Sequence, residues 1–510
     1  MPSRLEFQFT LPGVSTTPVR RDPDAPLHLL VMADFSGRGH RETPAALLDL
    51  TQRSLMTVDA DNFNAVMARL APKLRLPLDA DHGTPLTLGF GQIDDFHPDA
   101  LYQRLELFQA LRRARARLLN PASFTQAVAE LNASPVPFTT QEPASPAPTV
   151  TSESDSDLLE RLLGRAPAAA SPPRPTDPGA AAIQTLLQAV VQPHIVRSDP
   201  SQPAWIAAVD AAISDQMRAI LHQPIFQALE AAWRGVYHLV ATFDPDVVRV
   251  SLLDVTQQEL LLDLRAAAGD PRATSLYTSL IDQGVRMHDG QPWTVLVGDY
   301  RFGTTVEDLA LLGALGALGA YAGGPFLAAA DPNLLGCESA AVLADPTKWT
   351  PPPAELEDRW RLLRSSAVAP WLGLALPRVL LRLPYGFKTD PVEQFTFEEM
   401  PGGRDPEAYL WGNPALVCAR LIVAAFAEHG EAFSPGDVLE FDDFPAHVYE
   451  EADERVLQPA TETLLGERAM QAVLARGLMP LLGHRQRNAV RLVRFQSLAE
   501  PAAALAGAWR

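Results

Sequence analysis

Carboxylates that follow buried strands are the first residues of this chain that could do chemistry. Asp34 follows the apolar run 27–33, and Asp299 follows the apolar run 293–297. An acidic side chain in such a place can hold Mg²⁺ or meet a phosphate group, but an Asp that closes a turn by bonding nearby backbone fits the same pattern. We favour the turn-closing interpretation and keep an enzyme with a phosphate site at one of these residues as an alternative hypothesis.

The other catalytic patterns are incomplete. A phosphate-binding loop needs a glycine directly before its lysine, whereas Phe387 separates Gly386 from Lys388. Glu398 and Glu399 are adjacent, so they do not share a helix face and make a poor acid/base pair. The sequence has no Gly-x-Ser-x-Gly nucleophile motif, and its histidines have no partner at helix spacing, so we predict no zinc site. His222, before a predicted helix, is expected to satisfy local backbone groups. We therefore expect no enzyme activity, no cofactor and no metal.

Composition limits the partners and the compartment. The 510 residues carry a formal net charge of −19, from 42 Lys and Arg against 61 Asp and Glu. A surface this acidic repels phosphate, so we expect no nucleic acid; the arginines at 112–117 end a predicted helix, whose dipole they complement. Two distant cysteines give no disulfide framework, and the N-terminus lacks the apolar core of a signal peptide, which favours the cytoplasm. The uncharged run 309–330 is long enough to span a bilayer, but its small residues, Pro325 and acidic flanks predict a buried helix and no membrane insertion.

The elements that would position these residues fall into three sections. Residues 1–135 are predicted to form one compact α/β part. Residues 136–180 are rich in Pro, Ala, Ser and Thr, which is typical of a flexible linker, and contain a short leucine-rich helix at 157–164. Residues 181–510 alternate strand and helix again, which predicts a larger α/β part. We expect strands at 5–11, 27–33, 86–90, 247–253, 293–297 and 379–383, and helices from 61, 98, 205, 224 and 256.

Several segments, in order, resemble the large subunit of the type VI secretion sheath, TssC (VipB). Residues 220–235 look like its signature helix region, and the further matching segments are 296–300 (LVGDY), 324–326 (GPF), 360–365 (WRLLRS), 372–378 with 382–385, 409–413 (YLWGN), 477–481 (GLMPL) and 496–498 (QSL). Residues 5–135 resemble the small subunit, TssB (VipA), in the first strand and at 29–37 (LLVMADFSG), 58–63 and 93–100 (IDDFHPDA). The chain is therefore similar to a fusion of the two subunits.

The resemblance implies a mixed α/β (α+β) sheath-subunit fold and a structural, self-associating protomer of a contractile sheath that drives an inner tube outward. It implies as partners the chain itself or other sheath subunits, inner-tube and baseplate proteins, and a ClpV-like ATPase. The ATPase would bind the leucine-rich helix, although that helix could instead pack on its own domain; its leucines are Leu158, Leu159, Leu162 and Leu163. Six residues of the matching segments fit equally well as core anchors or as interface residues: Trp233, Arg234, Trp360, Arg361, Arg364 and Trp411.

The C-terminus departs from the family pattern. Large subunits of this family continue well beyond the segment that corresponds to 496–498, into a region that contributes to strand exchange between neighbours, whereas this sequence ends at Arg510. We therefore expect the usual C-terminal region to be lacking. This leaves a second hypothesis, a sheath-like accessory module that caps or regulates a lattice of full-length subunits without forming tubes itself.

Overall fold

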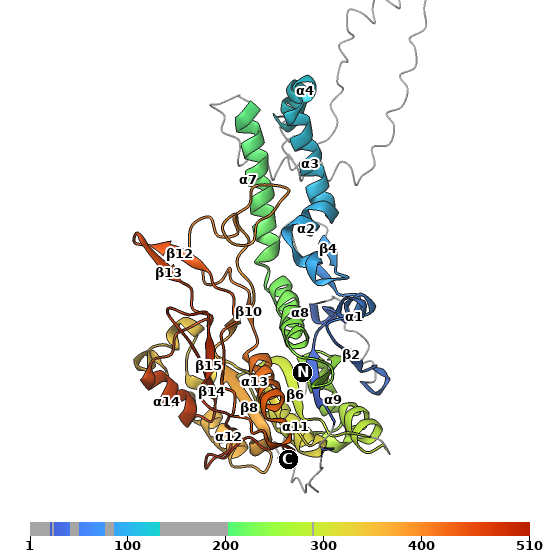
Figure 1. Cartoon of the computed structure of the whole chain (residues 1–510), viewed down its shortest axis with the longest axis vertical. Helices are drawn as coiled ribbons and strands as arrows, with labels where there is room; N and C mark the ends of the chain where they lie inside the picture. Colours follow the sequence, from blue (N-terminus) through green and yellow to red (C-terminus); the bar gives the residue numbers. More distant parts are fainter. Residues whose placement is uncertain are drawn as a thin grey trace, which may run out of the picture. The chain divides into compact units, whose positions relative to one another are not determined.

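The computed structural model describes residues 21–22, 25–40, 50–76, 86–132, 202–287 and 290–509. Over these residues strands and helices are mixed along the chain, so the expected α/β fold class is confirmed (Figure 1). The chain divides into two compact units, Met1–Ala100 with Met217–Arg510, and Leu101–Gln216. The predicted strand at 5–11, the linker at 136–180 and its leucine-rich helix lie outside the described residues.

A sheet of nine described strands forms the centre of the first unit, in the order β11-β15-β14-β8-β7-β6-β1-β5-β2. Six neighbouring strands, β14 to β5 in this order, run parallel, and antiparallel pairing occurs at both edges. The strands are β1 (Leu27–Ala33), β2 (Met56–Val58), β5 (Val248–Asp254), β6 (Val295–Phe302), β7 (Phe326–Ala330), β8 (Leu372–Leu376), β11 (Glu440–Phe441), β14 (Met479–Gly483) and β15 (Val490–Leu492). A parallel sheet must be covered on both faces, which explains why its strands are nearly continuous apolar runs.

The N-terminal segment supplies an interior strand of this sheet. β1 pairs with β5 over all seven residues, from Leu27 opposite Val248 to Ala33 opposite Asp254. On its other side, β1 pairs with β6 from Leu29 to Met32. The expectation that residues 1–135 form one compact part does not hold for this strand, because its backbone pairs on both sides with strands of the larger part.

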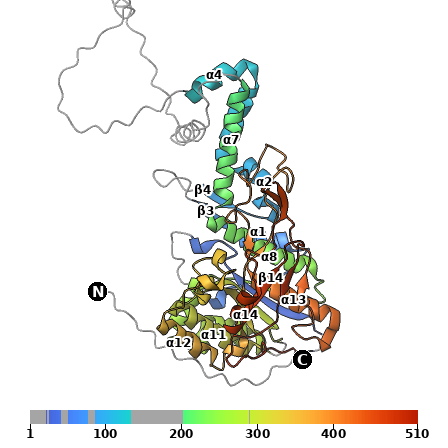
Figure 2. The same cartoon turned by 90° about the vertical axis from the view of Figure 1, so that its left-hand side faces the viewer.

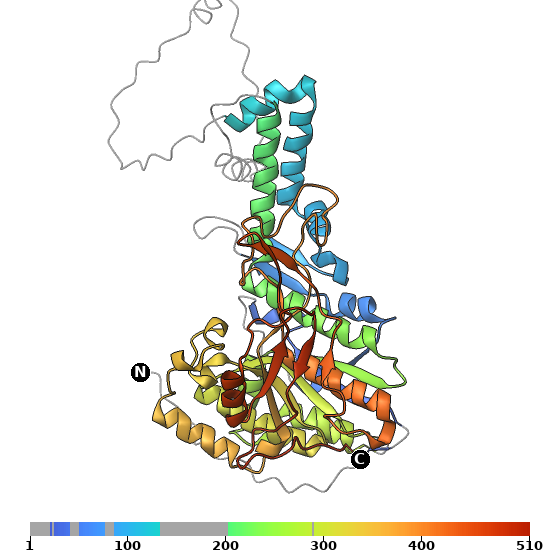
Figure 3. The same ribbon diagram turned by 60° about the vertical axis from the view of Figure 1, so that its left-hand side comes forward.

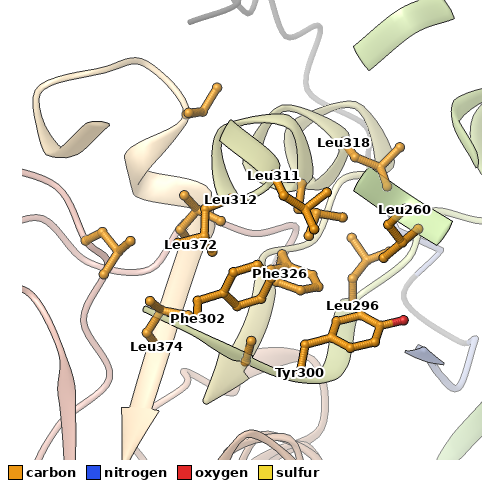
Figure 4. Close-up of a cluster of buried hydrophobic side chains, with 14 of the residues drawn as sticks. Leu260, Leu296, Tyr300, Phe302, Leu311, Leu312, Leu318, Phe326, Leu372 and Leu374 are labelled. Atoms are coloured by element: carbon orange, nitrogen blue, oxygen red, sulfur yellow. The ribbon is translucent and has the colours of Figure 1, made fainter. Parts of the chain in front are cut away.

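Helices cover the two faces of the sheet (Figure 2). α9 (Gln257–Ala266), α11 (Val306–Ala322) and α12 (Ala354–Arg364) contribute to one large apolar cluster, into which Leu296, Tyr300 and Phe302 of β6 point (Figure 4). Alternate residues of a strand face opposite ways, so the intervening residues of β6 face the other side, where α13 (Pro414–His429) packs on β6, β7 and β8. α8 (Pro224–Thr242) packs against α13.

Smaller elements complete the first unit. Two further pairs of strands are β3 (Lys73–Leu76) with β4 (Leu86–Gly89), and β12 (Val448–Glu451) with β13 (Glu454–Leu457). The remaining elements are α1 (Phe63–Leu70), α10 (Ser275–Tyr277), α14 (Glu467–Ala475), and the two-residue strands β9 (Val379–Leu380) and β10 (Trp411–Gly412).

The second unit is helical. It contains α3 (Glu106–Leu119), α4 (Pro121–Asn132) and most of α7 (Gln202–Leu221), and α3 lies beside α7 in Figures 1 and 3. Arg115 of α3 donates two hydrogen bonds to Asp210 of α7, at 2.5 and 3.2 Å. The Gln202 amide donates to the Leu118 carbonyl at 2.6 Å. These contacts join a helix of the N-terminal segment to the first helix described after the linker.

Several expected boundaries are wrong for local reasons. The run 309–330 is not one helix: α11 ends before Gly323, whose φ of 93° favours glycine, and the last five residues form β7. The helix from Pro98 breaks at Leu105, which has extended backbone between α2 (Pro98–Arg104) and α3. The strand expected at 379–383 is limited to β9. β6 extends to Phe302, so Asp299 lies within that strand and not after it.

Candidate functional site

The two halves of the chain meet around Trp233 of α8. Its side chain is 0% exposed, and its indole N–H donates to the Phe35 carbonyl at 3.0 Å. The Phe35 and Phe63 rings pack on the indole with centroid distances of 5.1 and 5.6 Å. The apolar spacing that made Trp233 a candidate anchor therefore places it in a core shared with the N-terminal segment.

An ion cluster joins the same two halves at the carboxyl ends of β1 and β5. Arg53 donates to both carboxylate oxygens of Glu259, at 3.0 and 2.5 Å, and Arg38 pairs with Asp254. Glu259 also completes the predicted capping box with Thr256 at the start of α9. Burial opposes ionisation of Glu259, but its hydrogen bonds with Arg53 and the Thr256 N–H lower its pKa. Both arginines thus attach the N-terminal segment to the larger segment through ion pairs with buried or half-buried carboxylates.

A second ion cluster, centred on Arg382, lies entirely within the larger segment. Its guanidinium donates to Glu399 at 2.7 and 3.0 Å and to Glu230 of α8 at 2.9 Å, and both carboxylate side chains are 0% exposed. Burial would raise the pKa of Glu399, but Arg382, together with hydrogen bonds from His222 and the Tyr385 backbone N–H, outweighs it and the pKa falls to about 2. The cluster therefore ties α8 to the chain around residues 382–399 through buried, ionised groups.

Arg234 and Tyr385 complete this cluster. Arg234 donates to Glu230 at 2.7 Å and to the Tyr385 hydroxyl at 3.0 Å. The Tyr385 ring lies 4.1 Å from the Arg382 guanidinium carbon, and the backbone N–H of Tyr385 donates to Glu399 at 2.8 Å. Sequence reasoning assessed Glu399 only as a catalytic acid and missed this role. The signal in the sequence is that Arg234 and Arg382 lie in apolar segments. An arginine buried in such a segment needs a carboxylate as its partner.

The other predicted anchors lie in different places. Trp360 is 2% exposed in the large apolar cluster, and Trp411 packs with Leu380 and Tyr409 in a smaller one. Arg364 is buried and donates to the Leu498 carbonyl at 2.9 Å. Arg361 is exposed and pairs with Asp358 at 3.0 Å. The structure therefore does not bring these residues together into one site.

The candidate chemical residues have structural partners. Asp34 accepts hydrogen bonds from the N–H groups of Arg38 and Gly39, both at 2.8 Å, so its turn-closing role is confirmed. The Nε2 atom of His222 lies 3.4 Å from a carboxylate oxygen of Glu399, whereas local backbone was the expected contact. Burial raises the pKa of the Asp299 carboxyl to about 6, and a hydrogen bond with Asn413 opposes this shift. Phe387 and Lys388 lie on an exposed loop, whose Phe387 N–H donates to Glu398.

Known sheath families match both halves of the chain. Residues 203–499 match the sequence model of VipB, described as EvpB/VC_A0108, tail sheath N-terminal domain. This match covers more than half of the chain. The chain belongs to the VipB tail sheath family. Residues 7–133 match the model described as type VI secretion system, VipA, VC_A0107 or Hcp2, so a VipA-type segment and a VipB-type segment are fused in one chain, as the sequence motifs predict.

Two proteins of Pseudomonas aeruginosa strain PAO1 are similar to the two segments. The type VI secretion system sheath protein TssC1 is 34% identical over 331 residues, which is 63% of this chain and 66% of TssC1. The type VI secretion system sheath protein TssB1 is 31% identical over 99 residues, which is 19% of this chain and 55% of TssB1. The chain thus spans about two thirds or less of each relative.

Two further predictions concern ligand and membrane contacts of the VipB-family chain. The four leucines proposed to bind an ATPase, Leu158, Leu159, Leu162 and Leu163, lie outside the described residues. Among the residues that the structure does describe, no helix has the length and apolar character needed to cross a bilayer. The same residues contain no group of three His, Cys, Asp or Glu side chains placed to hold a metal ion.

Proposed function

We propose that this chain is a structural, non-enzymatic and self-associating component of the contractile sheath of a type VI secretion system, and that it acts in the cytoplasm to drive an inner tube outward. The observation that carries the proposal is the shared sheet: β1 of the VipA-type segment lies between β5 and β6 of the VipB-type segment. Two sheath segments thus build one folded unit within a single chain.

The fusion has a physical consequence for assembly. One polypeptide fixes the ratio of the two segments at one to one, and the tether raises their effective concentration. The ion pairs of Arg38 and Arg53 with the larger segment add charged contacts to the strand pairing. A building block of this kind adds both segments to a lattice in one step.

The partners of the proposed sheath component are itself or other sheath subunits, inner-tube protein, baseplate proteins and a ClpV-like ATPase. We assign the ATPase contact to the linker leucines. Replacing Leu159 and Leu162 with Ser should abolish binding in a pull-down with the ATPase and leave the melting temperature nearly unchanged. A melting temperature lowered by several degrees, with ATPase binding intact, would assign these leucines to the core and remove this partner contact.

Electron microscopy of the purified full-length chain tests the proposal. Long tubes of regular diameter support a sheath component. Monomers or small discrete oligomers contradict it and support the alternative, an accessory module that caps or regulates a lattice of full-length sheath subunits. If the chain does not polymerise, a full-length TssB–TssC pair would be added to it. Microscopy would then show whether or not the chain binds at the ends of the tubes.

A further inference from the structure

Charge is distributed unevenly along the C-terminal part of the chain. Residues 428–454 contain ten Asp or Glu and no Lys or Arg, whereas residues 468–499 contain six Arg and no Asp or Glu. The second section is therefore positively charged, although the whole chain has a net charge of −19. The arginines at 112–117 form a cluster in the sequence, whereas the six arginines of this region are separated by other residues, so no short motif marks it.

The acidic section ends in the exposed hairpin β12–β13. Glu450, Glu451, Asp453 and Glu454 lie at its tip, and all four are exposed. No salt bridge to another described residue involves any of these four carboxylates. Glu451 lies directly opposite Glu454, an arrangement of like charges that destabilises a strand pair. Arg455 lies opposite Glu450 and compensates one of the four carboxylates, so the tip keeps an excess of negative charge, with one unfavourable pair at Glu451 and Glu454.

The base of this hairpin is well anchored. The Gln458 N–H donates to the His447 carbonyl at 2.7 Å, and the His447 ring lies 2.6 Å from the Tyr409 hydroxyl. Tyr409 is itself buried beside Trp411. The acidic tip is therefore presented on a fixed stem, which lowers the entropy lost when a partner binds.

The arginine-rich section lines an open pocket of about 600 Å³ beside α14. Arg364 and Arg494 line it, and Glu500 is the sole acidic residue among the lining residues. Arg364 contacts Glu500 at 3.1 Å, whereas Arg494 donates to the Gln496 amide oxygen at 2.6 and 2.9 Å and has no carboxylate partner in the described part of the chain. Arg468 is exposed one turn before the lining residue Gln471 on α14, so it extends this positive surface.

We propose that the acidic β12–β13 tip of one copy docks on the arginine-lined pocket at α14 of the next copy. The inference rests on the proposed sheath function, for which it supplies a contact between protomers. Guanidinium groups pair well with carboxylates, and opposite charges fix the register of an interface. The tip and α14 lie apart in the first unit (Figure 1), so the contact joins unlike surfaces head to tail. Repetition of such a contact gives a ring or a helical array and not a closed pair.

Charge reversal in the full-length chain tests this contact. The tip variant is Glu451→Arg with Glu454→Arg, and the pocket variant is Arg468→Glu with Arg494→Glu. Sedimentation velocity at about 0.05 M salt, where exposed charges are weakly screened, should find self-association of each variant weakened about tenfold or more. An equimolar mixture should recover association to within about threefold of wild type, because intact tips then meet intact pockets and reversed tips meet reversed pockets.

Matched controls and separate readouts decide the outcome. Glu338→Arg and Arg286→Glu reverse exposed charges elsewhere and should leave association unchanged. Unweakened association of the tip variant, or a mixture of folded variants that does not recover, overturns the proposed contact. If every variant forms tubes equally well, the proposed sheath function is supported and the proposed contact is excluded. If association depends on salt and on the tip but never gives tubes, the proposed contact is supported and the proposed sheath function is excluded. If the wild-type chain never associates, both proposals are excluded.

Discussion

Replacing Arg382 with Met tests the buried ion cluster most directly. The substitution keeps most of the side-chain volume but removes the cation that donates two hydrogen bonds to Glu399 and one to Glu230. Glu230 retains Arg234, whereas Glu399 loses its paired cation while its side chain stays fully buried. Removing one partner of a buried ion pair costs roughly 3–5 kcal/mol. We expect a loss of this size in the free energy of unfolding at neutral pH, measured by urea denaturation.

The pH dependence of the loss follows from the pKa of Glu399. In the wild-type fold this pKa is about 2, below the ordinary value of 4.5, so ionised Glu399 contributes stability above a pH of about 4.5 that is lost as the pH falls toward 2. Without Arg382, burial is opposed only by the hydrogen bonds from His222 and the Tyr385 N–H, so we expect the pKa of Glu399 to rise above its unfolded value. The folded variant then binds a proton more readily than the unfolded chain, so its deficit should shrink as the pH falls from neutral toward about 5.

Arg378→Met is the matched control. Arg378 also makes two hydrogen bonds to one carboxylate, that of Glu462, at 2.5 and 2.9 Å, but its side chain is 36% exposed. A solvent-screened pair of this kind contributes about 1 kcal/mol or less. Equal losses for the two variants, or an Arg382→Met deficit that is the same at both pH values, would refute the reasoning.

Three further predictions concern the joined halves and the buried acid of β6. Trp233→Ala should lower the free energy of unfolding by on the order of 3–5 kcal/mol, because it empties a core shared with Phe35 and Phe63; an unchanged thermal midpoint with lost self-association would instead make Trp233 an interface residue. Proteolysis within 136–180 should leave fragments that co-elute on a sizing column, because β1 is paired on both sides, and separate elution would contradict the shared sheet. Burial raises the pKa of Asp299 from 3.8 to about 6, so stability should fall as the pH rises between these values. Asp299→Asn should remove that fall and stabilise the chain above pH 6 by about 3 kcal/mol in urea titrations.

Local patterns predicted the elements whose stability is local. The apolar spacing of α1 and α8 and the Thr256–Glu259 capping box are set by residues three and four positions apart. The same reasoning failed at 309–330, where composition predicts one helix and the turn at Gly323 sends the chain into a neighbouring strand. The ordered motifs also predicted the fusion of two sheath segments, which the family matches confirm.

The sequence by itself therefore determined the class of fold, most of the elements and the sheath family, because these follow from short-range periodicity and from segments that keep their order. The tertiary structure decided which strands lie beside β1 and which carboxylates meet Arg382. Both outcomes depend on where the chain returns: β1 pairs with residues more than 200 positions away, and Arg382 and Glu230 are 152 residues apart. The sequence of an apolar strand predicts that the strand is buried, but it does not predict which strand lies beside it. In the same way, an arginine in an apolar segment indicates that a carboxylate must pair with it, but it does not indicate which carboxylate.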